Sequence, residues 1–412
     1  MPDGPLPAPL VGWSPTTGSG GETEMGITMH ALQRRRRGLL VLTGSIALLV
    51  AASTGPTAVA KPQRTDPLQE RVNAIRDSGA VGVFAETAAS GTRDKARAGT
   101  AERGTAKPMP RNGRFRIGSA AKTFTATVVL QLVGEGRLSL DDTVEQWLPG
   151  LVQGNGYDGG AITVRQLLRH TSGIRDTQPE IPALNSAQGY RAERFRTYSP
   201  KELVGLAMRT SPVFRPGNGW SYSNTNYVLA AMIIHKVTGR SWAREVNARI
   251  IRPLGLKDTS TPGVFPFVLG PHARAYASFG TGTGTGTDVT TLNPSMAVGS
   301  GSIISTTRDL TRFYSALLQG RLLDAAQLNQ MTATVPAPEL GVRYGLGLGE
   351  LPLPCGGSYF GHPGELLGYH SWSGVSRDGS RTAVVYVNSD GGKDTQKAMR
   401  ALVDEELCRA RP

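Results

Sequence analysis

Metal-ligating side chains, long apolar runs and acidic residues are all scarce in this chain of 412 residues. Two cysteines and six histidines are present, and none stands at the spacing of a metal site, so no metal centre is expected. Basic residues outnumber acidic ones by 45 to 32, which gives a net charge of +13. They are dispersed and accompany no recognition motif, so we expect no nucleic-acid binding. The surplus instead favours contact with anionic polymers of the cell envelope.

Residues 1–60 have the order of a secretory signal rather than that of a folded domain. A segment rich in Gly, Pro, Ser and Thr precedes a basic cluster at Arg34–Arg37, an apolar run at Leu39–Ala52 and the small residues Ala58-Val59-Ala60. The apolar run is short and interrupted, whereas a membrane-spanning helix needs about 20 apolar residues. We predict a cleaved signal peptide and a protein secreted to the cell envelope. An uncleaved membrane anchor is the alternative, and twin-arginine export is a further possibility for the route.

Both cysteines, Cys355 and Cys408, lie in the part that would be exported. An even number of cysteines in an oxidising compartment predicts one disulfide, and two free thiols are the alternative. The closed loop would hold about 54 residues, for which the chain-entropy relation gives roughly 4 kcal/mol of stabilisation.

Strand-like sequence lies at both ends of the chain and helix-like sequence lies in the middle. This order predicts an α/β fold in residues 61–412, with a sheet part at about 66–137 and 298–412 and an inserted, mainly helical domain at about 138–297. The stretch Gly280–Thr287 alternates glycine and threonine, and we expect a mobile loop, or a lid near the site. The expected helices are 67–77, 123–133, 163–170, 200–208, 227–238, 241–251 and 397–408, and the expected strands are 80–87, 91–101, 114–117, 344–351, 358–361, 369–375 and 382–388.

The sequence Ser119-Ala-Ala-Lys122 opens the apolar, helix-like run Thr123–Val133. Residues three apart share one face of a helix, so the amine of Lys122 can reach the hydroxyl of Ser119. A desolvated lysine loses affinity for its proton and can act as the base for a serine nucleophile. The helix N-terminus would also point N–H groups at a developing oxyanion. By itself, the spacing is equally typical of an exposed lysine on an amphipathic helix.

Two further groups carry side chains suited to proton transfer. Tyr222-Ser223-Asn224 follows a turn, where a tyrosine hydroxyl can move a proton and an asparagine amide can both donate and accept hydrogen bonds. The alternative is a capping unit, with Asn224 or Asn226 as the helix N-cap. His362-Pro363-Gly364 stands at the end of the expected strand 358–361, and it can place a cation or donor beside a closely approaching substrate. The alternative is an ordinary histidine near a turn.

Taken in order, the groups at Ser119, Tyr222 and His362 resemble the three motifs of the serine β-lactamase and penicillin-binding-protein superfamily. Within it, the chain is similar to the secreted serine D-alanyl-D-alanine carboxypeptidases and class C β-lactamases, which carry Tyr-x-Asn at the second motif. The two cysteines match a disulfide of the closest carboxypeptidase relatives. The resemblance covers nearly all of residues 66–408, including Phe115–Ser119, Ile162–Leu168, His170–Gly173, Tyr222–Tyr227, Gly301–Thr306 and Tyr344–Leu348.

This resemblance implies a β-lactamase/transpeptidase-like fold, with an antiparallel sheet flanked by helices. It also implies acyl transfer without a metal or organic cofactor. Ser119 would attack a carbonyl carbon and form an acyl-enzyme. Lys122 and Tyr222 would share the proton transfers, and Asn224 would hold Lys122 and the amide of the substrate.

The third motif would complete the site in the same way. The resemblance implies an oxyanion hole formed by the backbone N–H groups of Ser119 and Glu365. His362 would support Tyr222 and one end of the substrate. Gly364 would let the substrate lie flat along the strand.

The third motif also departs from the carboxypeptidase pattern. The close relatives have hydroxyl residues where this chain has Pro363 and Glu365, and a basic residue where it has Gly349. In the relatives the two hydroxyl residues help to bind the terminal carboxylate of the substrate, which a glutamate would repel. A neutral ester, an internal peptide bond or a substrate with a free amine would fit better beside Glu365.

We therefore predict a secreted serine hydrolase, with D-alanyl-D-alanine carboxypeptidase activity on peptidoglycan peptides as the first hypothesis and β-lactams as acylating inhibitors. An esterase, or a D-amino-acid peptidase or amidase acting on a small ester or amide, is the second hypothesis. A non-hydrolytic penicillin-binding or cell-wall-binding module is the third. No Gly-x-Ser-x-Gly sequence occurs, which argues against an α/β-hydrolase.

Overall fold

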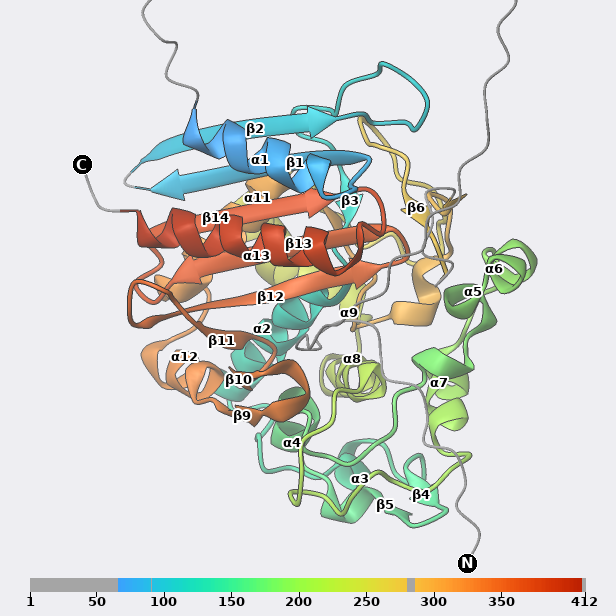
Figure 1. Ribbon diagram of the computed structural model, residues 1–412. Coiled ribbons are helices and arrows are strands. Elements are labelled where there is room, and N and C mark those ends of the chain that lie inside the picture. The colour runs from blue at the N-terminus through green and yellow to red at the C-terminus, as the bar shows by residue number, and fades with distance from the viewer. Residues whose placement is uncertain (1–65, 90, 280–285, 410–412) are drawn as a thin grey trace, which may run out of the picture. The chain divides into compact units, whose positions relative to one another are not determined.

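A computed structural model describes residues 66–89, 91–279 and 286–409. Its centre is an eight-stranded antiparallel sheet with helices on both faces, which confirms the expected α/β fold (Figure 1). The predicted signal segment at 1–60, and residues 280–285 of the glycine–threonine stretch, lie outside the described residues. The strands, in their order across the sheet, are β2 (Thr92–Gly99), β1 (Gly82–Ala89), β14 (Arg381–Val387), β13 (Tyr369–Ser376), β12 (Ser358–Leu366), β11 (Gly349–Pro352), β10 (Val342–Tyr344) and β9 (Val335–Ala337).

The sheet joins the two ends of the described chain. Strand β1 pairs with β14, with Phe84 opposite Tyr386 in the register. Six of the seven residues of β14 are buried, as expected for a central strand covered on both faces. Tyr386 stacks on Phe115 with 4.1 Å between ring centroids, so the last strand also packs against the segment that leads to Ser119.

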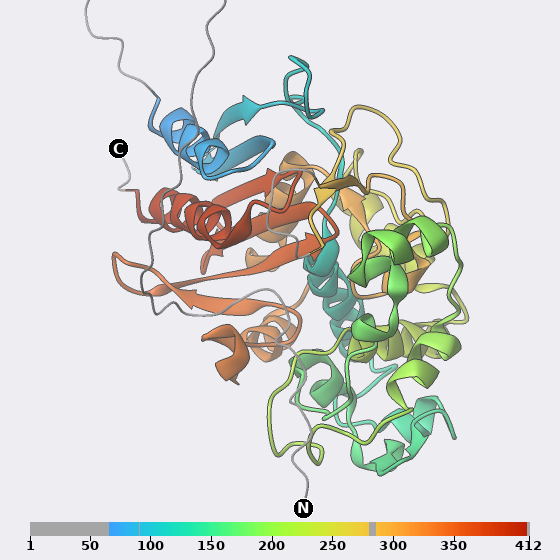
Figure 2. The same cartoon turned by 45° about the vertical axis from the view of Figure 1, so that its right-hand side comes forward.

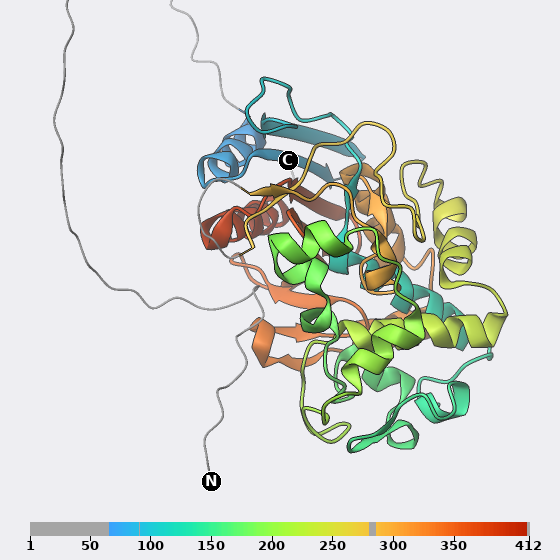
Figure 3. The same ribbon diagram turned by 90° about the vertical axis from the view of Figure 1, so that its right-hand side faces the viewer.

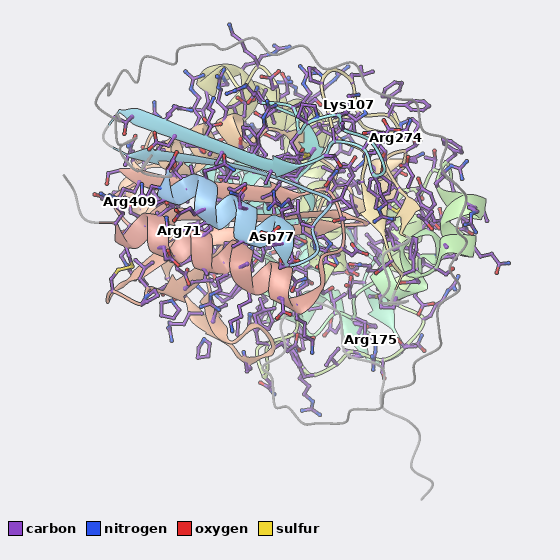
Figure 4. All side chains as sticks on the ribbon, turned by 45° about the horizontal axis from the view of Figure 1, so that its top comes forward. Arg71, Asp77, Lys107, Arg175, Arg274 and Arg409 are labelled. Atoms are coloured by element: carbon purple, nitrogen blue, oxygen red, sulfur yellow. A yellow bond between two sulfur atoms is a disulfide. The ribbon has the colours of Figure 1, made fainter. Side chains whose placement is uncertain are left out.

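Helices α1 (Pro67–Asp77) and α13 (Gly392–Cys408) cover one face of the sheet, and α11 (Thr307–Leu318) covers the other (Figure 1). Helix α1 begins where the sequence predicts, because the Asp66 side chain accepts the N–H of Leu68. Arg71 of α1, labelled in Figure 4, donates to Glu406 of α13 at 2.7 Å and also to Glu405.

The middle of the chain is mainly helical, as predicted, and packs beside the sheet (Figures 2 and 3). Its central element is α8, which is buried along most of its length. The described residues from Asp66 onward form one compact unit. The α-helices of four or more residues in this region and around it are α2 (Ala121–Gly134), α3 (Val144–Trp147), α4 (Val164–Arg169), α5 (Pro182–Asn185), α6 (Ala187–Glu193), α7 (Pro200–Ala207), α8 (Asn224–Thr238), α9 (Trp242–Val246) and α12 (Ala325–Thr332).

Several predicted boundaries are wrong. Strand β12 continues to Leu366, because β13 supplies hydrogen-bond partners beyond the predicted end at Gly361. The predicted strand 344–351 is two strands, β10 and β11, which pair with each other in a hairpin. The predicted helix 241–251 becomes a π-helix over Asn247–Ile251. Helices α11 and α12 were not predicted.

The predicted disulfide is confirmed. Cys355, in the β11–β12 connection, is bonded to Cys408, the last residue of α13, across a sequence separation of 53. Within the described ranges there is no helix with the length and hydropathy needed to cross a membrane.

Candidate active site

Ser119 lies on a tight turn whose first residue, Gly118, has to be a glycine. Strand β3 (Phe115–Arg116) leads through Gly118, which has φ of 49°, into a short 3-10 turn and then directly into α2. A Cβ atom on Gly118 would lie 2.6 Å from the backbone nitrogen of Glu365. The absence of a side chain therefore lets the backbone of β12 lie against the residue before Ser119.

Lys122 is fully buried one turn after Ser119, as the spacing predicts. Its Nζ lies 3.1 Å from Ser119 Oγ, 2.6 Å from Asn224 Oδ1 and 3.1 Å from the backbone oxygen of Ser300. Burial lowers the pKa of Lys122 to about 7, although the Asp176 carboxylate opposes the shift. Asn224 and Ser300 can only accept from Lys122, so a neutral amine donates to both and turns its lone pair toward the Ser119 hydroxyl.

Tyr222 contacts both Ser119 and Lys122. Its ring centroid is 4.7 Å from Lys122 Nζ, and its hydroxyl is hydrogen-bonded to the Ser119 side chain. Burial raises the pKa of Tyr222 well above its usual value, with the Ser119 hydrogen bond opposing. The phenol therefore keeps its proton at neutral pH and can serve as a proton donor.

Asn224 connects Lys122 to Asp176, a residue that was not predicted from the sequence. Asn224 is the first residue of α8, and Ser223 occupies the N-cap position, so the alternative of Asn224 or Asn226 as the N-cap is wrong. The Asn224 side-chain nitrogen donates to Asp176 Oδ2 at 3.0 Å and to Gln178 Oε1 at 3.0 Å. No spacing in the sequence indicated Asp176, although it lies three residues after the stretch His170–Gly173.

His362 differs from its expectation in both place and chemistry. It lies inside β12, opposite Ser373 of β13, rather than at a strand end. Its Nδ1 donates to the backbone oxygen of Pro363 at 2.5 Å, and its Nε2 accepts from the Tyr344 hydroxyl at 3.0 Å. Burial and the charge of Lys122 lower its pKa to about 3. His362 is therefore a neutral, internally satisfied group, with its ring 6.3 Å from that of Tyr222.

The remaining residues of the third motif lie close to the nucleophile turn. A side chain on Gly364 would collide with the backbone oxygen of Ile117, so this glycine allows the strand and the turn to touch. The peptide groups of Glu365 and Ser119 are thereby brought to neighbouring positions, where the predicted oxyanion hole would lie. Strand β11 pairs with β12 only along Ser358–Gly361, and no other described strand pairs with 362–366 on that edge.

The Glu365 side chain is 44% exposed and belongs to a charged cluster. Its Oε2 lies 3.9 Å from Nδ1 of His370, the residue opposite it on β13, and His370 Nε2 lies 2.8 Å from Asp390 Oδ1. Burial opposes a charge on His370, but the two carboxylates together raise its pKa. Throughout the part of the chain that the structure describes, no group of three His, Cys, Asp or Glu side chains is placed to hold a metal ion.

Comparison with known proteins agrees with this geometry. The Beta-lactamase family profile matches residues 68–407. A D-stereospecific amidohydrolase from Streptomyces sp. superposes with a TM-score of 0.77 and 44% identity, over 84% of this chain and 98% of its own. D-amino acid amidase from Ochrobactrum anthropi SV3, complexed with L-phenylalanine amide, gives a TM-score of 0.73 and 29% identity over 82% and 96%.

A match to the sequence of a penicillin-binding protein points the same way. Penicillin-binding protein 4* of Bacillus subtilis is 28% identical over 323 residues, which cover 75% of this chain and 68% of that protein. The residues matched by the Beta-lactamase family profile, 68–407, contain the nucleophile turn, the buried lysine and the third-motif strand described above. The chain belongs to the Beta-lactamase family, within the β-lactamase/transpeptidase-like superfamily of serine hydrolases.

Proposed function

We propose that this protein hydrolyses amide bonds of D-amino acid derivatives through an acyl-enzyme on Ser119. The observation that carries the proposal is the setting of Lys122, whose buried amine lies 3.1 Å from Ser119 Oγ and has its pKa lowered to about 7 by burial. An amine in this state accepts the serine proton at neutral pH. Similarity to a D-stereospecific amidohydrolase and to a D-amino acid amidase supports the substrate class.

Acylation follows from the positions of three side chains. Ser119 Oγ attacks the carbonyl carbon while its proton passes to Nζ of Lys122. The negative charge that develops on the carbonyl oxygen is stabilised by the N–H groups of Ser119 and Glu365. Tyr222 then donates its proton to the leaving nitrogen, and the proton held by Lys122 restores the phenol. Water attacks the acyl-enzyme with the same groups acting in the opposite direction, which releases the acid and frees Ser119.

The charge next to the oxyanion position supports a substrate with a free amine. Glu365 and Asp390 flank His370, so a protonated imidazole balances only one of the two carboxylates. Burial raises the pKa of Glu365 and the charge of His370 opposes the shift, while the side chain stays 44% exposed and open to a cationic group of a substrate. A substrate ammonium would be attracted here, whereas a terminal carboxylate would be repelled.

D-alanyl-D-alanine carboxypeptidase is the second candidate. The match to a penicillin-binding protein favours it. The neutral state of His362 and the presence of Glu365 count against it, because neither offers a positive charge to a C-terminal carboxylate. β-Lactams, which carry a carboxylate, remain proposed acylating ligands of Ser119. Export to the cell envelope also remains a proposal, supported by the order of segments in residues 1–60 and by the Cys355–Cys408 disulfide.

One substrate panel tests the proposal. The full chain and its Ser119→Ala variant would be incubated with D-phenylalanine amide, L-phenylalanine amide, a peptide ending in D-Ala-D-Ala, a p-nitrophenyl ester and a fluorescent penicillin. We expect Ser119-dependent release of ammonia from the D-amide, at least tenfold faster than from the L-amide.

Other outcomes would reassign the function. Faster release of D-alanine than of ammonia would identify a carboxypeptidase, and turnover of the ester alone would identify an esterase. A penicillin adduct without turnover of any substrate would indicate a binding module. Ammonia release that persists in Ser119→Ala would refute the nucleophile.

A further inference from the structure

Asp176 lies behind Asn224 on the side away from Lys122. It belongs to the segment between α4 and α5 and directly follows Arg175, which is labelled in Figure 4. Its Oδ1 accepts the backbone N–H of Asn224 at 3.0 Å, and its Oδ2 accepts from the Asn224 side-chain nitrogen at 3.0 Å. The backbone N–H of Gln178 is a third donor, at 3.3 Å from Oδ1. Burial raises the pKa of Asp176, and these hydrogen bonds together with the charge of Lys122 oppose the shift. Because every one of these partners is a donor, the arrangement fits a carboxylate and not a carboxylic acid.

This segment is fixed firmly to the start of α8. The backbone oxygen of Arg175 accepts from the hydroxyls of Thr225 at 2.8 Å and Ser223 at 3.2 Å. The N–H of Thr177 donates to Thr225 Oγ1 at 3.0 Å. The Ser223 side chain makes no capping hydrogen bond within α8, so Asp176 performs that role from another segment. The helix N-terminus and its dipole also favour an anion at this point.

The side-chain amide of an asparagine can rotate by about 180°, which exchanges its oxygen, an acceptor, with its nitrogen, a donor. Asp176 can only accept, so it holds the side-chain nitrogen of Asn224 on its own side. The side-chain oxygen of Asn224 must then point at Lys122, where Oδ1 lies 2.6 Å from Nζ. If the amide were reversed, an N–H would face the N–H groups of Lys122, and the lysine would lose one of its two acceptors.

We propose that Asp176 is a positioning residue for catalysis: it fixes the orientation of the Asn224 amide and supplies the negative charge that balances the Lys122 base. The proposal rests on the role of Ser119 and Lys122 in the proposed function, but not on the identity of the substrate. Asp176 touches no reacting atom: it holds Asn224 by hydrogen bonds and acts on Lys122 through its charge.

The groups around Lys122 leave Asp176 as its counter-charge. His170 and His362 are both held neutral, because burial and the charge of Lys122 lower their pKa values. Tyr222 and Tyr227 are held protonated, because burial raises theirs. The Glu365 carboxylate acts on Tyr222 and is paired with His370 at 3.9 Å. Arg175 itself points elsewhere and donates to the backbone oxygen of Ser211 at 2.7 Å.

Two variants separate the charge of Asp176 from its hydrogen bonds. Asp176→Asn removes the charge and brings a second N–H group against the Asn224 amide. The exchange Asp176→Asn with Asn224→Asp restores complementary donors and acceptors but moves the charge to the residue that contacts Lys122. The matched control is Asp158→Asn, since Asp158 is an exposed carboxylate that caps Gly160 at 2.8 Å in another part of the chain.

The measurement is the rate of Ser119 labelling by a fluorophosphonate probe between pH 5 and pH 10, followed by the mass of the intact protein. In Asp176→Asn we expect the plateau rate to fall at least tenfold and the acid limb to move about one pH unit lower, because a lysine that loses a nearby anion releases its proton more easily. In the exchanged variant the acid limb should move above that of the wild type, with partial recovery of the plateau. Asp158→Asn should match the wild type.

An acid limb at the same pH in the wild type, Asp176→Asn and the exchanged variant would overturn the proposal, whatever the plateau rates. A purely structural role predicts this result, because loss of fold lowers the labelled fraction without moving the limb. Ser119→Ala serves as the separate check on the proposed function, since labelling that persists there refutes the nucleophile and not the role of Asp176. If Asp176→Asn does not fold, the exchanged variant alone tests the proposal, since only a charge effect moves the acid limb of its labelling profile to higher pH.

Discussion

Replacing Lys122 by methionine should abolish acylation and change the stability of the protein by an amount that depends on pH. Burial lowers the pKa of Lys122 from 10.5 to about 7. At about 1.4 kcal/mol per pH unit, holding this amine inside costs the native state about 5 kcal/mol at any pH below 7. The unfolded chain binds more protons between pH 7 and pH 10.5, so this cost declines as pH rises through that window.

Methionine has no ionisable group, so burying it carries no such penalty in the free energy of folding. The free energy of unfolding of Lys122→Met, measured relative to the wild type, should therefore fall by about 3 kcal/mol between pH 6 and pH 9. The acceptors that lose Nζ, Asn224 Oδ1 and the Ser300 oxygen, subtract about 1–3 kcal/mol each, but this loss does not vary with pH. The pH dependence of the difference is thus the part that reports the state of Lys122.

The assay is urea unfolding of both proteins at pH 6, 7, 8 and 9, with the fluorophosphonate probe confirming that labelling is lost. Lys201→Met is the matched control, since Lys201 is an exposed lysine on α7. A stability difference between Lys122→Met and wild type that stays constant from pH 6 to pH 9 would refute the reasoning. It would mean that Lys122 titrates alike in the folded and unfolded chains and is not a base at neutral pH.

Three further predictions concern the proton donor, the substrate end and the disulfide. Tyr222→Phe should lower kcat for a D-amino acid amide by about 10²–10⁴, and less for a p-nitrophenyl ester, whose leaving group needs no proton; equal losses on both would contradict the donor role. Glu365→Thr should raise the rate of D-alanine release from a peptide relative to ammonia release from D-phenylalanine amide, and an unchanged ratio in a competition assay would show that Glu365 does not select charge. Cys355→Ser should lower the free energy of unfolding in urea by up to about 4 kcal/mol relative to the oxidised wild type, while Ser119 labelling at 25 °C persists. An unaltered unfolding midpoint would show that the Cys355–Cys408 disulfide does not stabilise the fold.

The sequence predicted correctly those elements that are determined by neighbouring residues, such as helix caps and short spacings. Helix α1 was predicted residue for residue, because Asp66 caps it, Pro67 begins it and buried residues recur at Leu68, Val72 and Ile75. Ser119 and Lys122 were also placed correctly, since a three-residue spacing on a helix fixes their contact. Helix α11 could have been found in the same way, because Thr306 caps it by accepting the N–H of Asp309.

The features that the sequence did not predict depend on contacts between distant segments. His-Pro-Gly looks like a turn, but pairing with β13 keeps His362 and Gly364 inside a strand. The neutral state of His362 depends on its burial and on the charge of Lys122, which comes from a distant segment of the chain. Asp176 is hydrogen-bonded to Asn224 across 48 residues, and no periodicity within either segment predicts that contact.

The unpaired edge of β12 at 362–366 has a consequence for chirality. A substrate backbone that hydrogen-bonds to this edge in extended form turns its successive side chains alternately to the two faces of the sheet. Inverting one Cα atom sends that side chain to the opposite face while the backbone hydrogen bonds stay in register. Gly118 and Gly364 hold one face against the turn that carries Ser119. A substrate of the proposed kind, bound along this edge, would therefore place D- and L-residues on opposite faces, and only one of these faces lies against the turn that carries Ser119.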